Sequence, residues 1–321
     1  MLNISKMEHI AILCGGNSAE RNISLLSAKT VFKYLNRTKY IAVIIDLKDE
    51  DFVCSRGIIN KKNFTLVSNK KIIKFKKVFV VIHGPPAENG IIQDYFDKLN
   101  IKYTCCNSDV SNITFDKFRC NKELVKLGFS CAKSILVNKN FNINYILENI
   151  SLPIFIKPNR SGSSYGISKV VQKDEISNAI YKASKYDCEI IVEEEVKGSE
   201  ISCGVYKFKD KIIALPITEI ISENIFFDFE AKYEGKSKEI TPARINDLLT
   251  EKIQNISKSV YSKMNLSGVC RIDFILEKDE VFIIEINTIP GMSKNSIIPQ
   301  QIAASNINFS DFLDICLTES I

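Results

Sequence analysis

Polar side chains alternate with apolar ones in two short segments near the end of the chain, and this pattern constrains the fold most. Arg271 and Asp273 alternate in the first segment, and Glu285 and Asn287 alternate in the second. A period of two predicts strands whose polar groups share one face while the residues between them pack into a core. Carboxylate and amide oxygens on rigid strands suit Mg²⁺, which keeps several waters and bridges to substrate phosphates. The pattern therefore predicts an enzyme that uses ATP.

The pairing of these two strands can also be predicted. Asp273 and Glu285 can serve the same metal only if they lie on one face, since a slip of one residue would turn one carboxylate into the core. Direct pairing of the two residues requires a turn of odd length, such as 278–280 or that turn widened by one residue on each side. The apolar positions expected in the core are Ile272, Phe274, Ile284 and Ile286.

Size and composition exclude several classes of protein. The 321 residues suffice for two or three domains, and 45% hydrophobic and 25% charged residues are ordinary globular values. A net charge of +5 with dispersed lysines gives no reason to expect nucleic acid as a partner. The apolar runs are too short for a membrane span or a secretion signal. Ten cysteines without a Cys-x-x-Cys pair, beside two histidines, argue against zinc and for free thiols in a cytoplasmic protein.

The first part of the chain, residues 1–106, alternates between strand and helix patterns. Short apolar runs rich in Val and Ile predict strands at 10–14, 40–47, 78–82 and 102–105, and a helix is expected at 91–99. Ser18 can cap an earlier helix that ends near Leu35. The buried side of that helix is expected to include Ile23, Leu26 and Val31. We expect a small α/β domain with a parallel sheet.

A polar, turn-like stretch at 107–112 suggests a boundary, and two further parts follow it. Residues 107–192 have an α+β pattern, with helices expected at 115–127 and 174–183 and strands at 152–156, 167–171 and 190–194. Residues 193–321 have strands at 200–207 and 211–217, the acidic hairpin, and a helix at 250–264. The long polar stretch 222–244 lacks periodicity, so we expect a mobile loop there.

Two segments have the composition of nucleotide-binding loops. Lys157 precedes a Gly- and Ser-rich loop at 159–166, whose backbone N–H groups can approach phosphate oxygens closely. A flexible hairpin tip is the alternative for this loop. The acidic run 193–200 follows an apolar strand directly, so its first members can line a cleft, where a carboxylate could accept the adenine amino group and Glu200 the ribose hydroxyls. A solvated acidic turn is the alternative there.

Two further segments follow strands and are candidates for substrate contacts. Ligands bind at the carboxyl ends of strands in open α/β sheets. Glu20 lies in such a strand-to-helix turn, where it could bind a substrate ammonium or simply complement the helix dipole. His83 lies at the end of another strand, where it could contact substrate or be a loop histidine with its hydrogen bonds satisfied.

Taken in order, these motifs resemble the D-alanine–D-alanine ligase family of the ATP-grasp superfamily, over almost the whole chain. The resemblance rests on residues 15–24, 83–84, 157–170, 227–233, 271–273 and 285–296. It implies an N-terminal α/β domain followed by a two-part ATP-grasp fold. It also implies ATP-dependent phosphorylation of one D-alanine carboxylate, attack by the amine of a second D-alanine, and a role in making peptidoglycan precursors. Two Mg²⁺ ions per site, replaceable by Mn²⁺, and a cytoplasmic homodimer are further implications.

The resemblance also implies roles for residues. Those for ATP are Lys117, Lys157, Ser163, Ser164 and Lys232 at the phosphates, Glu193 and Val196 at adenine, and Glu200 at ribose. The implied metal ligands are Asp273, Glu285 and Asn287, beside Arg271, which stabilises charge on the reacting carboxyl group. Substrate residues are Glu20 for the first ammonium, Gly291 and Ser296 for the second D-alanine, and His83. Ser163 and Tyr233 resemble the pair that, with Glu20, ties two loops over the closed site.

The chain departs from the family pattern in two places. The segment after His83 is usually rich in glycine with an acidic pair, whereas here it reads Pro85-Pro86-Ala87-Glu88-Asn89. Ser161 stands where many relatives carry an acid before Gly162. The first departure leaves the substrate contacts of this segment open, but not the class of reaction.

Three other functions stand as alternatives. One is a ligase that joins D-alanine to D-lactate, although Tyr233 favours an amine, because related ligases that use D-lactate carry phenylalanine there. Another is a different ATP-grasp ligase that joins a carboxylate to an amine. The third is a nucleotide-binding protein without turnover, and the intact metal set with Arg271 argues against it. The expected partners are therefore D-alanine and ATP, rather than nucleic acid or membrane.

Overall fold

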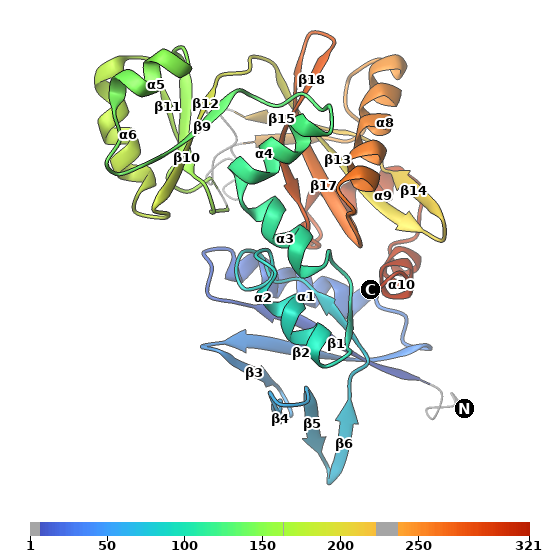
Figure 1. The fold of residues 1–321 in the computed structure, drawn as a ribbon. Helices are drawn as coiled ribbons and strands as arrows, with labels where there is room; N and C mark the ends of the chain where they lie inside the picture. The colour runs from blue at the N-terminus through green and yellow to red at the C-terminus, as the bar shows by residue number, and fades with distance from the viewer. Residues whose placement is uncertain (1–6, 163, 223–236) are drawn as a thin grey trace.

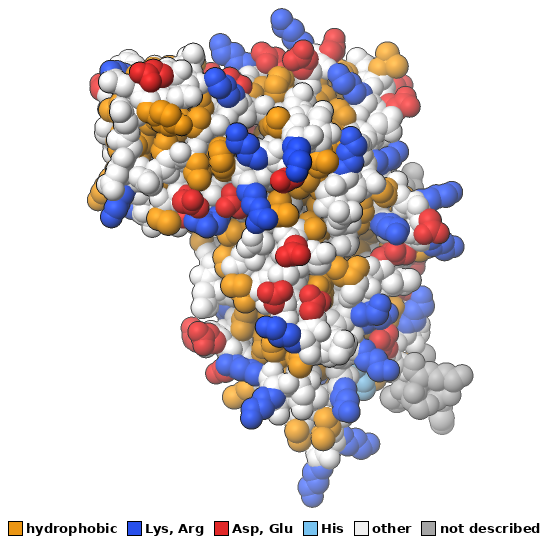
Figure 2. Space-filling view, in the orientation of Figure 1, with side chains coloured by type: hydrophobic (Ala, Val, Ile, Leu, Met, Phe, Trp, Pro, Cys, Tyr) orange, Lys and Arg blue, Asp and Glu red, His pale blue; other side chains and the backbone are white. Residues whose placement is uncertain are grey.

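The computed structural model describes residues 7–162, 164–222 and 237–321, and Figure 1 shows the course of the chain. The described residues form a six-stranded N-terminal sheet, a four-stranded central sheet, a six-stranded C-terminal sheet and a separate two-stranded hairpin. None of the described helices combines the length and the apolar character needed to cross a bilayer. Figure 2 shows positive and negative side chains intermingled over most of one face.

The N-terminal sheet has the strand order β4-β3-β2-β1-β7-β8. Its parallel strands are β1 (Glu8–Gly15), β2 (Tyr40–Lys48), β7 (Lys77–Val80) and β8 (Lys102–Tyr103), and its antiparallel edge is β3 (Asp51–Cys54) and β4 (Gly57–Ile58). Residues 10–14 are fully buried, because apolar cores cover both faces of the sheet. The predicted parallel α/β unit is confirmed. Between β2 and β7 the chain forms only short strands, including the hairpin of β5 (Thr65–Ser68) and β6 (Lys71–Lys74).

Two helices of the N-terminal part are α1 (Arg21–Tyr34) and α2 (Ile91–Lys98), and two expectations for α1 are wrong. The helix begins after Glu20, and the Ser18 hydroxyl instead donates to the His83 carbonyl over 2.6 Å. Leu26 is 49% exposed, because small residues form most of the buried side and let the helix lie close to the sheet. The buried residues are Ser24, Ser27, Ala28 and Val31.

The central sheet is antiparallel, with the order β11-β10-β12-β9. Its strands are β9 (Ser134–Asn138), β10 (Ile154–Pro158), β11 (Ser168–Val170) and β12 (Glu189–Glu194), and its helices are α5 (Ile143–Asn149), the 3₁₀ turn η2 (Lys173–Glu175) and α6 (Ile176–Ala183). Figure 1 shows α5 and α6 on the side of this sheet away from the C-terminal sheet. Ile154 and Ile156 join the core with these helices, so Phe155 and Lys157 project from the opposite face.

The C-terminal sheet has the order β16-β15-β13-β17-β18, with β14 paired to the end of β13. Its strands are β13 (Ser199–Phe208), β14 (Lys211–Ala214), β15 (Thr218–Ser222), β16 (Ser237–Ile240), β17 (Val269–Glu277) and β18 (Glu280–Asn287). Helices α3 (Ser108–Phe115), α4 (Lys117–Lys126) and α8 (Asp247–Lys263) share its core. Helices α9 (Ile297–Ala304) and α10 (Phe309–Thr318) instead share a core with α1 and β1.

The turn predicted at 107–112 is wrong, because its polar residues begin a helix. The Asn107 side chain accepts from the N–H of Val110 and caps α3, and the Asp116 side chain accepts from the N–H of Arg119 and caps α4. The helix predicted at 115–127 therefore begins later than expected, at Lys117, because Asp116 caps it there. The division into 1–106, 107–192 and 193–321 stays a prediction, and its second boundary falls inside β12.

The acidic hairpin joins β17 to β18, and its register is partly as predicted. Asp273 pairs directly with Glu285, so the prediction that their carboxylates share one face is confirmed. The prediction of an odd-length turn is wrong, because Glu277 pairs with Glu280 across a turn of two residues, 278–279. A shift of register after Asp273 reconciles the even turn with the direct pairing.

That shift is a β-bulge in which Ile284 has no partner on β17. Consequently Ile284 is only partly buried and does not lie in the core where it was expected. The bulge turns this side chain toward the cavity described below. The other three apolar positions are buried as predicted: Ile272, Phe274 and Ile286.

The stretch 222–244 differs in part from the expected loop. Residues 223–236 lie outside the described residues. Residues 237–240 form β16, which pairs antiparallel with β15, so the loop prediction is wrong there. The strand is short and polar, and it gives no alternation strong enough to predict it.

Candidate active site

Two cavities adjoin at the acidic hairpin. The first, of about 350 Å³, is lined by the β1–α1 turn, the end of β7, strands β17 and β18, and the start of α9. The second, of about 660 Å³, lies between the central and C-terminal sheets and is lined by β10, β12 and β18. Four residues line both cavities, and we call them the shared wall: Lys117, Ser161, Gly162 and Glu285.

The second cavity collects the described residues predicted to bind ATP. They are Lys117, Lys157, Ser164, Glu193, Val196 and Glu200. Apolar side chains complete the lining, and they include Phe155 on β10, Phe282 on β18 and the bulged Ile284. A cavity that combines apolar side chains with a few charged groups suits a nucleotide, whose base is apolar on its faces and polar at its edge.

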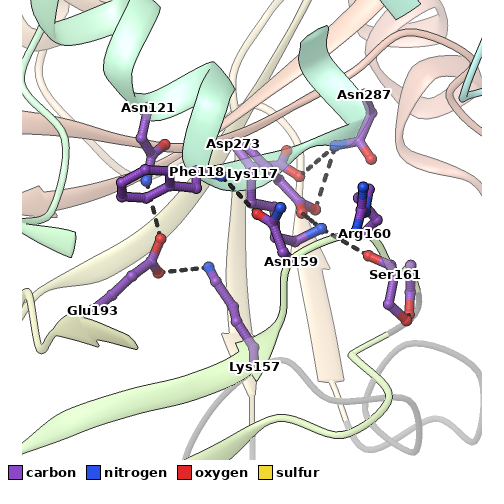
Figure 3. A network of polar contacts seen from close by, with 12 residues as sticks. Lys117, Phe118, Asn121, Lys157, Asn159, Arg160, Ser161, Glu193, Asp273 and Asn287 are labelled. Atoms are coloured by element: carbon purple, nitrogen blue, oxygen red, sulfur yellow. Dashed lines mark hydrogen bonds and ion pairs between the residues drawn. The ribbon is translucent and has the colours of Figure 1, made fainter. Parts of the chain in front are cut away.

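Lys157 and Glu193 form a buried ion pair in the second cavity. The Lys157 ammonium lies 2.6 Å from the Glu193 carboxylate, and both side chains are less than one-tenth exposed. Asn121 on α4 donates to the other carboxylate oxygen over 3.0 Å, as Figure 3 shows. The lysine predicted for phosphate and the acid predicted for adenine are therefore in direct contact.

Lys117 is the first residue of α4 and stands in the shared wall. Its ammonium donates to the Ser161 carbonyl over 2.7 Å and lies 3.8 Å from the Glu285 carboxylate. Burial lowers the pKa of Lys117, and the negative charge of Glu285 opposes that shift. A cation is thus held where the Gly/Ser loop meets the acidic hairpin.

Asn159 is a buried residue of this site that the sequence did not reveal. Its side chain accepts from the N–H of Phe118 over 2.9 Å, and its carbonyl accepts from the N–H of Lys117 over 3.2 Å. Figure 3 shows Asn159 between the start of the Gly/Ser loop and the start of α4, which it joins. Its position two residues after Lys157 places it at the start of the Gly/Ser loop, but no sequence pattern indicates its contact with Phe118.

On the acidic hairpin, Asp273 accepts from several donors. Arg271 donates to both carboxylate oxygens, over 2.8 and 2.7 Å, and Asn287 donates over 2.9 Å. Ser202 on β13 also donates to Asp273. Within the described ranges, no three His, Cys, Asp or Glu side chains form a group that could hold a metal ion. Asp273, Glu285 and Asn287 therefore offer a partial set of oxygen ligands, which fits Mg²⁺ completed by phosphate oxygens and water.

Glu20 lines the first cavity. It stands at the N-cap of α1, yet its side chain makes no capping hydrogen bond. A Cβ on Gly162 would lie 2.8 Å from Glu20 Oε2, so the carboxylate projects toward the Gly/Ser loop. Arg21 is the residue of this motif that fixes the turn, through its 2.7 Å ion pair with Asp46 on β2.

His83 also lines the first cavity, but it is anchored as a structural residue as well. It is 4% exposed, with Nδ1 2.9 Å from the Ile289 carbonyl and Nε2 3.5 Å from the Ser27 hydroxyl. Burial lowers the pKa of His83, and the charge of Glu20 opposes that shift. The histidine therefore fastens the end of β7 to the loop that follows β18.

Ser296 and Gly291 lie together at the start of α9. A Cβ on Gly291 would lie 2.6 Å from Ser296 Oγ, a close approach that requires glycine. The Ser296 hydroxyl is 2.8 Å from that of Ser293 and makes no capping bond to the helix. Both residues line the first cavity, where the free N–H groups of a helix start favour a carboxylate.

Two acids that were not predicted also line the first cavity: Glu88 and Glu239. Glu88 belongs to the segment after His83 that departs from the family pattern. Burial and the charge of Glu20 raise the pKa of Glu88 to about 8. Glu239 lies on β16, and only the unpredicted pairing of that strand could have indicated its position.

The structure thus brings the described predicted residues into two adjoining cavities, except Asp273, which is buried behind them and pairs with Glu285. The first cavity holds Glu20, His83, Arg271, Gly291 and Ser296, with Glu285 and Asn287 from the metal set. Ser163, Lys232 and Tyr233 lie outside the described residues. The contact predicted between these loops and Glu20 therefore stays a prediction.

Comparison with known proteins places this arrangement in a family. Two family models match, the D-ala D-ala ligase N-terminus over residues 9–106 and the D-ala D-ala ligase C-terminus over residues 129–318. A D-alanine–D-alanine ligase from Phocaeicola vulgatus is 40% identical over 312 residues, which cover 95% of this chain and 96% of the relative.

Two solved structures extend the likeness to the fold. D-alanyl-alanine synthetase A from Vibrio cholerae has a TM-score of 0.87 at 28% identity, covering 98% of both chains. The VanG D-Ala:D-Ser ligase from Enterococcus faecalis has a TM-score of 0.86 at 31% identity, covering 97% of this chain and 99% of that one. The chain therefore belongs to the D-alanine–D-alanine ligase family, whose members are ATP-dependent ligases of the ATP-grasp fold.

Proposed function

We propose that this protein joins two D-alanine molecules into D-alanyl-D-alanine while ATP is converted to ADP and phosphate. The shared wall is the observation that carries the proposal, since Lys117 and Glu285 line both cavities. A nucleotide in the second cavity and an amino acid in the first would meet at these two residues. Phosphoryl transfer asks little covalent chemistry of a protein and depends mainly on positioning and charge stabilisation.

The reaction has two steps. A carboxylate oxygen of the first D-alanine attacks the γ-phosphorus of ATP, which gives an acyl phosphate and releases ADP. The amine of the second D-alanine, after losing a proton, attacks the acyl carbon, and phosphate leaves from a tetrahedral intermediate. Negative charge develops on the carboxyl oxygens in the second step, so a fixed cation such as Arg271 and nearby N–H groups would stabilise it.

The described residues divide between the two substrates. For ATP we propose Lys117, Lys157 and Ser164 at the phosphates, Glu193 and Val196 at adenine, and Glu200 at ribose. For the amino acids we propose Glu20 at the first ammonium, Gly291 and Ser296 at the second D-alanine, and His83 at the junction of the loops. The family resemblance adds Ser163, Lys232 and Tyr233, which would close the site.

We infer that two Mg²⁺ ions, replaceable by Mn²⁺, accompany ATP. Asp273, Glu285 and Asn287 are the residues that would hold them, because they present oxygen ligands on one face of the hairpin. Bound there, the ions would neutralise charge on the phosphates. Arg271 and Lys117 neighbour the same acids, so the site already balances its carboxylates with cations.

We further propose that the protein is cytoplasmic, since ATP and D-alanine are available in the cytoplasm and the product would enter peptidoglycan synthesis. From the family resemblance we also propose that it is a homodimer. Analytical ultracentrifugation over a range of concentrations tests the oligomeric state. If the protein sediments as a monomer at all concentrations, the proposed dimer is contradicted, and the proposed reaction is unaffected.

A coupled assay of ADP release tests the reaction. D-alanine, L-alanine, D-serine and D-lactate are supplied separately and in pairs, and each product is identified by mass. D-serine is included because a ligase with that acceptor is 31% identical to this chain. We expect ADP release that requires D-alanine and a product with the mass of D-alanyl-D-alanine. ATP binding without product would contradict the proposal, and a dominant D-lactate or D-serine product would change the second substrate.

A further inference from the structure

Glu239 stands beside the region proposed for the second D-alanine. It lies on β16, directly opposite Ile220 on β15, so the two side chains share one face of the sheet. Ile220 packs against Ile297, the residue that follows Ser296. Strand pairing therefore holds Glu239 next to the start of α9, and both Glu239 and Ser296 line the first cavity.

Helix α9 also fixes the orientation of this carboxylate. The Gln300 side chain donates to Glu239 Oε2 over 2.5 Å and to the Asn295 carbonyl over 3.0 Å. Among the residues that the structure describes, Glu239 Oε1 has no hydrogen-bond partner. One oxygen is thus held by the helix, and the other is available to a ligand in the cavity.

Within the described ranges, no lysine, arginine or histidine side chain forms an ion pair with Glu239. Burial raises the pKa of Glu239, while the Gln300 hydrogen bond and the charge of Arg271 favour the ionised form. The Arg271 guanidinium donates to Asp273 rather than to Glu239. A partly buried carboxylate outside any described ion pair favours a cationic ligand.

A reaction between two amino acids brings two ammonium groups into the first cavity. The described acids that line this cavity are Glu20, Glu88, Glu239 and Glu285. Glu20 is proposed for the first ammonium and Glu285 for metal, and Glu88 is held largely protonated near neutral pH. Glu239 is the remaining carboxylate, and it is the one held beside Ser296.

We propose that Glu239 is a specificity-determining residue that binds the ammonium group of the second amino acid and so selects an amine over a hydroxy acid. This inference rests on the proposed function of the same site. An ammonium forms a charge-assisted hydrogen bond with a carboxylate, whereas the hydroxyl of D-lactate is neutral and forms a weaker one. Glu239 therefore lowers the KM of an amino acid acceptor and leaves that of a hydroxy acid nearly unchanged.

The substitution Glu239→Gln tests the proposal, because it removes the charge and keeps an oxygen for Gln300. We expect the KM for the second D-alanine to rise about tenfold or more, while the KM for ATP changes less than about twofold. With D-alanine and D-lactate in one tube, the ratio of D-alanyl-D-lactate to D-alanyl-D-alanine should rise by a similar factor. Glu239→Asp should recover part of the loss. Glu251→Gln, an equal charge change on the exposed surface of α8, is the control.

The possible results separate this inference from the function on which it rests. A wild-type protein that makes no D-alanyl-D-alanine removes the proposed function itself. If the wild type makes it, but Glu239→Gln lowers only kcat and leaves the product ratio unchanged, Glu239 merely neutralises Arg271 and the inference is overturned. Should Glu239→Gln fail to fold by circular dichroism, Gln300→Met removes the orienting donor and keeps the charge. We expect a smaller rise in the same KM for that variant, and no rise would overturn the inference.

Discussion

The ammonium of Lys157 lies 2.6 Å from a carboxylate oxygen of Glu193, and the two residues stand diagonally across the antiparallel strands β10 and β12. Removing two charges from water is costly, so such a pair is tolerated only while each member compensates the other. In the proposed function both residues also bind ATP. The same contact therefore links the stability of the central sheet to the nucleotide site.

Replacing Glu193 by Gln should affect both properties. Lys157 would be left buried without a counter-charge, which should lower the free energy of unfolding by about 3–5 kcal/mol. The KM for ATP should rise as well. Urea denaturation and ATP titration measure the two effects. The double variant Lys157→Met/Glu193→Leu should regain most of the stability but not the ATP affinity. A single variant as stable as wild type would show that the pair contributes nothing to the fold.

Glu20→Gln should change catalysis and leave the fold intact. Glu20 makes no capping hydrogen bond, so the loss of its charge near the helix dipole should cost well under about 1 kcal/mol. Losing an ion pair with a substrate ammonium in a closed site should cost on the order of 2–5 kcal/mol in kcat/KM for D-alanine. Thermal unfolding and steady-state kinetics of the same preparation test both parts. Unchanged kinetics would return Glu20 to a purely structural role.

The bulge in β18 predicts opposite effects for two isoleucines of one hairpin. Ile284→Ala should raise the KM for ATP with little loss of stability, because the bulge places Ile284 in the second cavity. Ile272 is fully buried in the core, so Ile272→Ala should lower stability by about 2–5 kcal/mol while the KM for ATP stays near that of wild type. The two variants are matched in chemistry and differ only in side-chain direction. Equal stability losses would contradict the bulge.

Glu88 should make stability depend on pH with a definite sign. Its pKa is raised from 4.5 to about 8 in the folded protein, so the folded chain keeps a proton that the unfolded chain has released. The resulting stabilisation is complete below about pH 4.5 and is lost as the pH rises through about 8. The Tm of Glu88→Gln relative to wild type should therefore increase between about pH 5 and about pH 8.5. A relative Tm that falls over this range would contradict the raised pKa, and Glu251→Gln serves as the control.

The strand pattern predicted which hairpin residues share a face, because side-chain direction in a strand depends only on whether positions are odd or even. The same rule could not predict the turn, since an even turn with a bulge gives the pairing that an odd turn gives without one. Ile284 was misplaced for this reason. Two of the residues missed by the sequence, Asn159 and Glu239, depend on contacts between segments far apart in the chain, and no local spacing encodes those.

For individual site residues, spacing alone left two interpretations open. Glu20 could have complemented the helix dipole, and His83 could have been an ordinary loop histidine. Resemblance to a family favoured the substrate roles, and both side chains line the first cavity. His83 shows that the two interpretations are not exclusive, because its hydrogen bonds to Ile289 and Ser27 are structural and the residue also lines the first cavity.

The shared wall has a thermodynamic consequence. Because Lys117 and Glu285 border both cavities, the charge that a ligand brings to one cavity alters the electrostatic environment of the other. Linkage then requires reciprocity: the factor by which a nucleotide changes the affinity for D-alanine equals the factor by which D-alanine changes the affinity for the nucleotide. Calorimetric titrations with a non-hydrolysable ATP analogue, carried out in both orders of addition, should therefore yield one coupling free energy from two independent experiments.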